Sequence, residues 1–489
     1  MGSTDYKLDF STFYNVINNT LTTTPTTRHG IDPGTEDSLP PVPVSTQDDV
    51  DQAVRAGQQA FLKWRDLSYD SRAVYLTQFA DAIEANRSGF ETLLGKETGK
   101  PLQGVVLELN FAILHLRETA KLRITSDEKI LEDIPERRAA IRFTPLGVGV
   151  GIVPWNFPLL LGLGKLDQAV LSGNAFIWKP SPFSPYTALK LGELAAKIFP
   201  PGVVQVLSGD ETLGPLLTAH PGISKISFTG SSATGKKVMA ACAGTLKRVT
   251  LELGGNDAAI ICDDVDLSVV APKIAVFCFL HSGQICMNIK RVYVHAKIYD
   301  QFLAQMVAVV KTFRTGAAGD ETAFSGPVQN AMQFEKLKGL YAEIEKQGWK
   351  VALGGGTLET PGKKEKGFFM PLTIIDNPPD DSRIVTEEPF GPIVPVLKWS
   401  GEEEDDVIRR ANDSNMGLGA SVWTADLERG ERMAKKLEAG SVWVNSHFEM
   451  APHVPFGGHK WSGIGMDWGV EGLKGWCNTQ AFWVRKVPN

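Results

Sequence analysis

The sequence predicts an α/β protein built on a parallel, doubly wound sheet. From Leu146 onward, short runs of small and β-branched residues alternate with longer segments that have helical periodicity. Such alternation is typical of parallel sheets that carry helices on both faces. The chain has 489 residues, which is too long for a single hydrophobic core. We therefore expect two or three domains.

The segment before this alternation is expected to be extended first and helical afterwards. Residues up to Pro43 are rich in proline and turn-forming residues. Thr46 is a predicted helix N-cap, because Asp49 stands at the capping-box position. Two more helices are expected over Ser71–Asn86 and Gln103–Leu122, and a strand over residues 137–144.

The elements of the sheet follow from the apolar runs and from the segments between them. Strands are expected at Gly147–Val153, Ala175–Trp178, Val203–Leu207, Lys225–Phe228 and Val249–Leu253. Helices are expected at Leu159–Ser172, Tyr186–Ile198, from Thr212 and from Ala233. A second α/β region, from Ala258 to Gly465, has predicted helices at Tyr299–Thr312, Asn330–Gln347 and Glu402–Asn412, and a last strand follows at Ala481–Val487.

Composition and charge exclude several classes of function. The net charge is −6 and the basic residues are scattered, so nucleic acid is not an expected partner. Five irregularly spaced cysteines argue against a disulfide framework, and the histidines form no metal-binding pattern. No membrane-spanning run or secretory signal is visible, so we expect a cytoplasmic protein without a membrane partner.

A glycine-containing turn between a predicted strand and helix is suited to bind a pyrophosphate. It runs from Phe228 to Lys237 and contains Gly230, Ser231 and Gly235. A helix N-terminus offers free backbone N–H groups and the positive end of the helix dipole to an anion. A P-loop is not expected, because Lys237 stands where that motif needs a hydroxyl side chain.

Three further residues are candidates for chemistry, and each also has an ordinary structural interpretation. Cys286 follows Gly283-Gln284, a polar pair that can expose a thiol, although most single cysteines are buried apolar residues. Glu252 lies between two leucines in a strand, where a carboxylate is costly unless it is paired or functional. Asn156 follows a buried strand and can either cap a helix or donate its amide to an oxyanion.

Taken together, these motifs resemble the aldehyde dehydrogenase superfamily over nearly the whole chain, from about residue 12 to about residue 485. The motifs that carry the resemblance are PWNFP (154–158), WKPSP (178–182), FTGS (228–231), LELGG (251–255), GQIC (283–286), EEPFGP (387–392) and PFGG (455–458). The resemblance implies a Rossmann-like NAD(P)-binding domain formed by residues 1–122 and 145–254, and an α/β catalytic domain formed by residues 255–471. It also implies a small β oligomerisation arm formed by residues 123–144 and 472–489. Because exposed strand edges need a partner, we expect a homodimer or a homotetramer.

The resemblance assigns the catalytic residues and a reaction, the NAD(P)⁺-dependent oxidation of an aldehyde to a carboxylic acid. Cys286 is implied to attack the aldehyde carbon, while Asn156 and the Cys286 backbone N–H hold the oxyanion of the thiohemiacetal. Loss of hydride to the nicotinamide leaves a thioester, which water hydrolyses with Glu252 as the general base. Lys165 matches a lysine close to this glutamate and is expected to help relay the proton.

The resemblance also assigns a cofactor site. Lys179 and Glu388 are implied to bind the two ribose groups, and Phe390 packs beside Glu388. Glycine and serine residues line the adenine and pyrophosphate, and the strand end that precedes Asn156 forms the wall behind the cofactor. The predicted cofactor-binding residues are Ile152, Val153, Pro154, Trp155, Lys179, Ser181, Pro182, Gly209, Phe228, Thr229, Gly230, Ser231, Gly235, Leu253, Gly254, Glu388 and Phe390.

Two departures from the better-known members bear on specificity. Pro182 stands where NAD-specific members often have a glutamate that repels a 2′-phosphate, so NADP⁺ is expected to bind as well. Gly164 stands where many members have a bulky aromatic, which predicts a wider substrate tunnel. The predicted tunnel residues suggest an apolar aliphatic or aromatic aldehyde, and they are Phe157, Leu161, Gly164, Ile285, Met287, Phe448, Met450 and Phe456.

Two alternative functions remain open at this stage. A CoA-acylating dehydrogenase would use Cys286 in the same way but pass the acyl group to CoA, and Glu252 favours hydrolysis over this reaction. A non-enzymatic binding protein on the same fold is expected to lack Cys286, Glu252 or Asn156, and all three are present.

Overall fold

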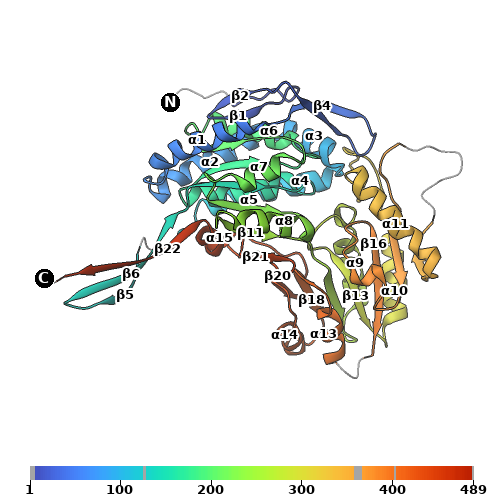
Figure 1. The fold of residues 1–489 in the computed structure, drawn as a ribbon. Coiled ribbons are helices and arrows are strands. Elements are labelled where there is room, and N and C mark those ends of the chain that lie inside the picture. Colours follow the sequence, from blue (N-terminus) through green and yellow to red (C-terminus); the bar gives the residue numbers. More distant parts are fainter. Residues whose placement is uncertain (1–5, 125–127, 357–365, 401–403, 487–489) are drawn as a thin grey trace.

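A computed structural model describes residues 6–124, 128–356, 366–400 and 404–486. Figure 1 shows two α/β lobes and a thin arm that projects away from both. The first lobe contains the N-terminal half of the chain, and the second contains most of the residues after Asn256. The predicted α/β class with parallel strands is confirmed.

The first lobe is built on an eight-stranded sheet with the order β2-β1-β9-β8-β7-β10-β11-β21. The strands from β9 to β11 are parallel, as the alternating pattern predicts. From β7 the chain moves outward to β8 and β9 and then returns to place β10 on the other side of β7. This reversal creates a crevice at the carboxyl ends of β7 and β10, where ligands bind in open α/β sheets. The strands are β1 (Asn15–Ile17), β2 (Thr20–Thr22), β7 (Val148–Ile152), β8 (Ala175–Lys179), β9 (Val204–Val206), β10 (Lys225–Thr229), β11 (Arg248–Glu252) and β21 (Gly463–Ile464).

Helices cover this sheet, and most lie close to their predicted positions. Thr46 caps the first helix with the predicted capping box to Asp49. The sequence analysis missed the helix that begins at Arg87, directly after Asn86, and ends at Thr98, before Gly99, whose φ of 73° stops it. The helices are α1 (Gln47–Trp64), α2 (Tyr69–Ala85), α3 (Arg87–Thr98), α4 (Leu102–Thr119), α5 (Pro158–Leu171), α6 (Tyr186–Ala196), α7 (Leu213–Ala219) and α8 (Ser232–Ala243). The proline-rich segment before them includes a hairpin of β3 (Thr27–Ile31) and β4 (Ser38–Pro43).

The second lobe contains a seven-stranded sheet with the order β14-β15-β16-β13-β12-β18-β19. Its strands are β12 (Asp257–Ile261), β13 (Ile289–His295), β14 (Val351–Leu353), β15 (Thr373–Asp376), β16 (Ile393–Trp399), β18 (Gly419–Trp423) and β19 (Ser441–Val444). The accompanying helices are α9 (Leu267–Phe279), α10 (Tyr299–Val310), α11 (Ala331–Gln347), α12 (Arg383–Thr386), α13 (Glu404–Asn412) and α14 (Leu427–Ala434). The predicted start of α13 at Glu402 lies outside the described residues.

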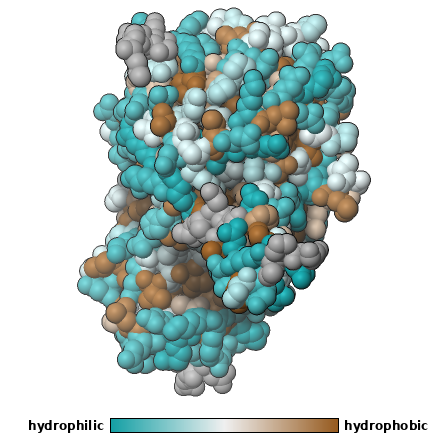
Figure 2. Space-filling view, turned by 90° about the vertical axis from the view of Figure 1, so that its left-hand side faces the viewer, coloured by the Kyte–Doolittle hydropathy of each residue, from teal (hydrophilic) through white to brown (hydrophobic). Residues whose placement is uncertain are grey.

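The arm is a three-stranded antiparallel sheet of β5 (Glu128–Asp133), β6 (Arg137–Pro145) and β22 (Cys477–Arg485). The predicted strand over 137–144 is confirmed by β6. The last strand begins at Cys477 rather than at Ala481, because it pairs with β6 along its whole length, from Cys477 opposite Pro145 to Arg485 opposite Arg137. Its predicted end at Val487 lies outside the described residues. Figure 2 looks onto the face that carries the arm.

A C-terminal segment returns from the second lobe to the first sheet. There β21 pairs with β11, so that Gly463 lies opposite Glu252. The short helix α15 (Gly469–Gly475) then leads into the arm. This return brings residues 455–468 beside the strand that carries Glu252. Within the described parts of the chain, no helix is long and apolar enough to cross a membrane.

Candidate active site

The carboxyl edge of the first sheet gathers the residues predicted to surround a cofactor. The parallel register places Ile152 opposite both Lys179 and Phe228, and Thr229 opposite Glu252. Side chains from four neighbouring strands therefore meet at the crevice of the switch point. The sequence motifs that end these strands are separated in the chain but adjacent in the sheet.

The turn after β10 has the geometry of an anion-binding helix N-terminus. Ser231 is the N-cap of α8, and its hydroxyl accepts the backbone N–H of Thr234. A side chain at Gly235 would lie 2.6 Å from Leu253, so glycine permits close contact between the helix and the strand end. The remaining free N–H groups of the first turn suit a pyrophosphate.

Polar groups beside this turn fit a nucleotide. Lys179 is buried, donates to the Pro180 carbonyl at 3.1 Å, and has no ion-pair partner among the described residues. Burial and the nearby Arg28 lower the pKa of Lys179 to about 8. The buried Thr229 hydroxyl has no hydrogen-bond partner in the described structure. Donors left free in this way fit the hydroxyl groups of a bound ribose.

The other predicted cofactor residues lie around the same crevice. The Ser181 hydroxyl accepts the backbone N–H of Phe183, and the Gly209 carbonyl accepts a hydrogen bond from Arg28 at 3.3 Å. The rings of Trp155 and Phe390 meet edge to face, with 5.4 Å between their centroids.

Glu388 connects the two lobes at this crevice. Its carboxylate accepts the backbone N–H of Gly255 at 3.0 Å and lies 3.3 Å from the Lys290 ammonium group. A side chain at Gly254 would collide with the same carboxylate. The glycine pair that follows Leu253 therefore allows Glu388 to approach the strand end, close to the predicted nicotinamide ribose.

Cys286 lies in a tight loop between η1 (Leu280–Gly283) and β13. His281, Ser282 and Gly283 all have positive φ, at 52°, 56° and 72°. A side chain at position 283 would overlap the Gly391 carbonyl, so this position requires glycine. The constrained backbone fixes the direction in which the loop presents Cys286.

Cys286 is a free cysteine of intermediate exposure, and its surroundings disfavour the thiolate. Burial raises the pKa of Cys286 to about 12, and Lys290 opposes this rise. The Lys290 ammonium group donates to the backbone carbonyls of Cys286 at 2.5 Å and Ile285 at 2.9 Å. These hydrogen bonds from Lys290 stabilise the backbone of the loop and place a positive charge near the sulfur of Cys286.

Asn156 contacts the same loop from the other lobe. Its side-chain amide donates to the Gln284 carbonyl at 2.9 Å, and the residue is buried. An amide has two N–H groups, so the second remains available to an oxyanion beside Cys286. The structure brings together Asn156 and Cys286 although 130 positions separate them in the chain.

Glu252 is buried, and neither of its carboxylate oxygens has a hydrogen-bond partner among the described residues. Burial and the nearby Asp467 raise the pKa of Glu252 well above its usual range, while Lys165 opposes the rise. Lys165 donates to Asp467 at 2.5 Å and to the Ser227 hydroxyl at 2.9 Å. A short chain of buried polar groups therefore begins beside Glu252.

The predicted substrate residues contribute to a single hydrophobic cluster, which also contacts Cys286. Phe157, Ile285, Met287 and Phe456 are buried in it, and Leu161, Phe448 and Met450 are partly buried against it. The predicted substrate residues are thus part of the apolar core of the first lobe, close to Cys286.

The space beside Gly164, where a wider tunnel is expected, is occupied by a ring from elsewhere in the chain. A β-carbon at this position would lie 2.9 Å from the indole nitrogen of Trp468 and 3.5 Å from the His115 ring. The space of the missing side chain is already filled by a ring from the C-terminal segment. The sequence contains no local signal for this packing, because Trp468 is far from Gly164 in the chain.

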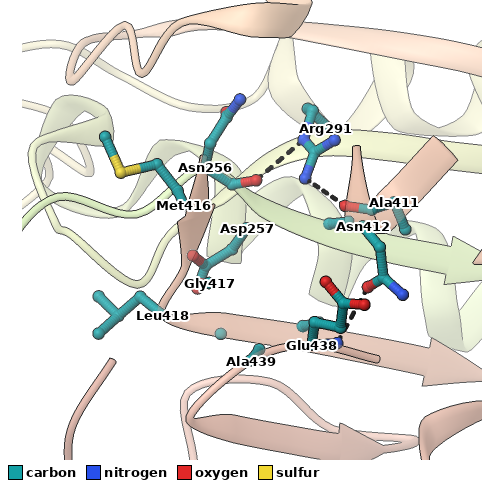
Figure 3. Close-up of a pocket in the computed structure, with 13 residues that line it drawn as sticks. Asn256, Asp257, Arg291, Ala411, Asn412, Met416, Gly417, Leu418, Glu438 and Ala439 are labelled. Carbon is teal, nitrogen blue, oxygen red and sulfur yellow. Dashed lines mark hydrogen bonds between the residues drawn. The ribbon is translucent and has the colours of Figure 1, made fainter. Parts of the chain in front are cut away.

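A polar cavity at the start of β12 has a volume of about 10 Å³, close to the size of one water molecule. Figure 3 shows Arg291 beside it, where the guanidinium donates to the backbone carbonyls of Asn256 and Ala411. Arg291 thus ties backbone segments together. Among the described residues, no group of three or more His, Cys, Asp or Glu side chains could hold a metal ion.

Comparison with known proteins identifies the family. The profile of the aldehyde dehydrogenase family matches residues 21–482. The chain is 40% identical to the aldehyde dehydrogenase LUC3 of Fusarium sp, over 98% of this chain and 100% of that protein. It is 37% identical to human retinaldehyde dehydrogenase 3, over 93% of this chain and 88% of that protein.

The chain belongs to the aldehyde dehydrogenase family.

Solved structures agree with this assignment. The crystal structure of betaine aldehyde dehydrogenase from Staphylococcus aureus in complex with NAD⁺ superposes with a TM-score of 0.93 at 29% identity, covering 98% of this chain and 96% of that one. The predicted family, fold and enzyme class are thereby confirmed. The roles of the individual residues of this aldehyde dehydrogenase stay predictions.

The sequence analysis missed several polar residues of this aldehyde dehydrogenase. Asp467 contacts Lys165 from 302 positions away, so no sequence spacing indicates the pair. His447 bridges the Met287 carbonyl and the Ser421 hydroxyl, each at 2.9 Å, and thereby supports the loop after Cys286. Lys290, four positions after Cys286, is the residue that a search near the nucleophile could have found.

Proposed function

We propose that this aldehyde dehydrogenase oxidises an apolar aldehyde to the carboxylic acid with NAD⁺, through a thioester on Cys286. The observation that carries the proposal is the buried carboxyl group of Glu252, which has no hydrogen-bond partner among the described residues and a raised pKa. A group in this state is suited to take a proton from water near neutral pH.

The first step is addition of the Cys286 thiolate to the aldehyde carbon. The thiol gives its proton to solvent water, and a C–S bond forms as the carbonyl π bond breaks and its oxygen becomes an oxyanion. The free amide N–H of Asn156 and the backbone N–H of Cys286 stabilise this charge by hydrogen bonds. Lys290, close to the Cys286 carbonyl, adds a positive field that favours the thiolate.

The second step converts the thiohemiacetal into a thioester. NAD⁺, when bound, would accept the hydride that leaves the former aldehyde carbon. Lys179 and Glu388 would hold the two ribose groups, and the N-terminus of α8 with Ser231 would bind the pyrophosphate. Trp155 and Phe390 line the crevice at the nicotinamide end and are in edge-to-face contact with each other.

The third step is hydrolysis of the thioester. Glu252 removes a proton from a water molecule, whose oxygen attacks the thioester carbon. The C–S bond then breaks, which restores the Cys286 thiolate and releases the acid. Glu252 passes its proton toward the Lys165–Asp467 pair, which neighbours it in the buried interior.

Two features extend the proposal to specificity and assembly. Pro182 carries no charge that would repel a 2′-phosphate, so NADP⁺ also supports turnover. The apolar cluster around Cys286 favours aliphatic or aromatic aldehydes over charged semialdehydes. The arm joins copies of the chain into a homodimer or homotetramer.

A product assay tests the proposal. The purified protein is incubated with NAD⁺ and a panel of aldehydes, with and without CoA, and both NADH and the acyl product are measured. We expect NADH formation with equimolar free acid, unaffected by CoA. Formation of acyl-CoA in place of the acid would contradict the hydrolytic role of Glu252, and a lack of NADH with every aldehyde would refute the activity.

A further inference from the structure

Trp468 has a backbone conformation that is rarely open to a bulky residue. It precedes α15 with φ of 65° and ψ of 165°. This region of conformational space is essentially restricted to glycine, because a β-carbon there meets the backbone. A non-glycine residue persists in it only where the surroundings hold it. The surroundings of the Trp468 side chain must therefore stabilise this backbone conformation.

The ring is buried among groups from both ends of the chain. It stacks on Phe456, with 5.2 Å between the centroids and 30° between the planes. It also contacts His115 at 5.0 Å and Phe111 at 6.1 Å, both on α4. The indole nitrogen lies 2.9 Å from the point where a β-carbon at Gly164 would stand.

Gly164 lies on the same face of α5 as two other predicted substrate residues. Phe157, Leu161 and Gly164 follow one another at helical spacing. This face begins at the N-terminal end of α5, next to Asn156, which donates to the Gln284 carbonyl in the loop that carries Cys286. Phe456, which stacks on Trp468, is also a predicted tunnel residue. Trp468 thus lies between two parts of the same apolar surface.

We propose that Trp468 is a specificity-determining residue whose indole forms the wall of the acyl pocket beside α5, in the space that Gly164 leaves open. This inference rests on the proposed function, because it assumes that the acyl chain lies on this surface. The stacked Trp468 and Phe456 rings present a broad aromatic wall. Such a wall admits slender aldehydes, with straight or planar conjugated chains, and excludes those with branches or wide rings at this level.

The contact between Gly164 and Trp468 involves an unfavourable residue or conformation on each side. Glycine inside α5 is less favourable than a residue with a side chain, and tryptophan at position 468 is held in a glycine conformation. An aromatic side chain at position 164 would avoid the second cost, because a helical backbone accepts it without strain. The wall is instead anchored on the C-terminal segment, which also carries Asp467 and Phe456.

Four variants test the wall. Trp468→Leu shortens the ring, Trp468→Phe keeps an aromatic, Gly164→Trp adds a second ring, and the double variant Gly164→Trp/Trp468→Gly moves the ring to the other side of the contact. Trp461→Leu is the matched control, because Trp461 is 48% exposed and lies outside this cluster. The readout is the ratio of kcat/KM for a branched or naphthyl aldehyde to kcat/KM for propanal.

We expect Trp468→Leu to raise this ratio about tenfold or more, since a gain of pocket space of a few methylene groups changes selectivity by that order. Trp468→Phe should raise it much less. Gly164→Trp alone should lower soluble yield and thermal stability, and the double variant should restore both with a ratio near that of the wild type. Such compensation is the mark of two residues that share one space.

An alkylation assay separates this inference from the proposed function. The rates at which iodoacetamide and a naphthyl iodoacetamide label Cys286 are measured by mass spectrometry without aldehyde or cofactor. Trp468→Leu should speed the naphthyl reagent relative to the small one, and Trp461→Leu should not. Unchanged ratios in both assays for Trp468→Leu would overturn the inference. If the wild type oxidises no aldehyde, the proposed function fails, and the alkylation ratio alone decides whether Trp468 forms the wall.

Discussion

At the scale of single residues, burial disfavours the charged forms of two acidic side chains in the site. Burial raises the pKa of Cys286 to about 12 and raises the pKa of Glu252 well above its usual range. Both groups must lose a proton at different steps of the proposed cycle. This separation of roles predicts that substitutions at the two positions have different kinetic consequences.

Replacing Glu252 with Gln should block the cycle after one turnover. The nucleophile remains, so the thioester and NADH form once, but the base that activates water is lost. We expect a burst of at most one NADH per active site and an acyl group on the peptide that contains Cys286, detected by mass spectrometry. Cys286→Ala is the control and should give neither. Steady turnover in Glu252→Gln would contradict the assignment, and loss of the burst would indicate that Glu252 ionises Cys286.

Pro182 is expected to affect the choice between NAD⁺ and NADP⁺. It neither accepts a hydrogen bond from a ribose hydroxyl nor repels a phosphate, so wild-type protein should reduce NADP⁺ as well as NAD⁺. Pro182→Glu should lower kcat/KM for NADP⁺ by about tenfold or more, because a like charge close to the 2′-phosphate costs at least ~1.4 kcal/mol. The value for NAD⁺ should change little. A wild type that cannot use saturating NADP⁺ would show that another group excludes it.

At the scale of the element, strand β12 begins with the buried carboxyl group of Asp257. Neither oxygen of Asp257 has a hydrogen-bond partner among the described residues, and His447 lies 3.9 Å away. Burial raises the pKa of Asp257 to about 7, with Lys290 opposing the rise. The pKa of His447 falls to about 3 for the same reason, so this histidine stays neutral. The carboxyl group is stabilised as the neutral acid in the folded state.

Asp257 should therefore make the folded protein less stable as the pH rises. Between its unfolded pKa of 3.8 and its folded pKa of about 7, the folded state binds more protons, and the free energy of unfolding falls with pH. Asp257→Asn cannot ionise, so its stability relative to wild type should increase by about 3 kcal/mol from pH 5 to pH 8. Urea unfolding at both pH values measures this difference. An equal effect at the two values would refute the raised pKa.

At the scale of the whole molecule, the arm exposes apolar side chains that a single chain cannot bury. Ile130, Leu131 and Trp483 are 54%, 60% and 62% exposed, on a sheet that projects from both lobes (Figure 1). Figure 2 shows this face as mostly hydrophilic, with hydrophobic side chains distributed among the polar ones. Apolar residues on a projecting sheet are typical of contacts between subunits.

The predicted oligomer can be tested at the arm. Trp483→Glu places a charge on this apolar surface, and we expect light scattering to detect a smaller assembly than that of the wild type. Leu246→Glu is the control, because Leu246 is 89% exposed and lies outside the arm. A wild type that is already monomeric, or an unchanged mass in Trp483→Glu, would argue against assembly through this surface.

The sequence by itself determined the features that depend on local pattern. Strand and helix alternation predicted the parallel sheet and most of its elements, since side-chain periodicity reflects which face of each element is buried. The motifs around Cys286, Glu252 and Asn156 identified the family, because each is a short run of neighbouring residues. The helix after Asn86 was missed because no loop precedes it and no side-chain cap marks its start.

Only the tertiary structure decided which distant residues meet. The contact of Lys165 with Asp467 and the ring of Trp468 in the space beside Gly164 depend on the return of the C-terminal segment to the first sheet through β21. A glycine in the sequence predicts open space, but whether that space is empty depends on packing from elsewhere in the chain. Close packing fills such gaps with whatever side chain the fold brings near, and no local pattern specifies that side chain.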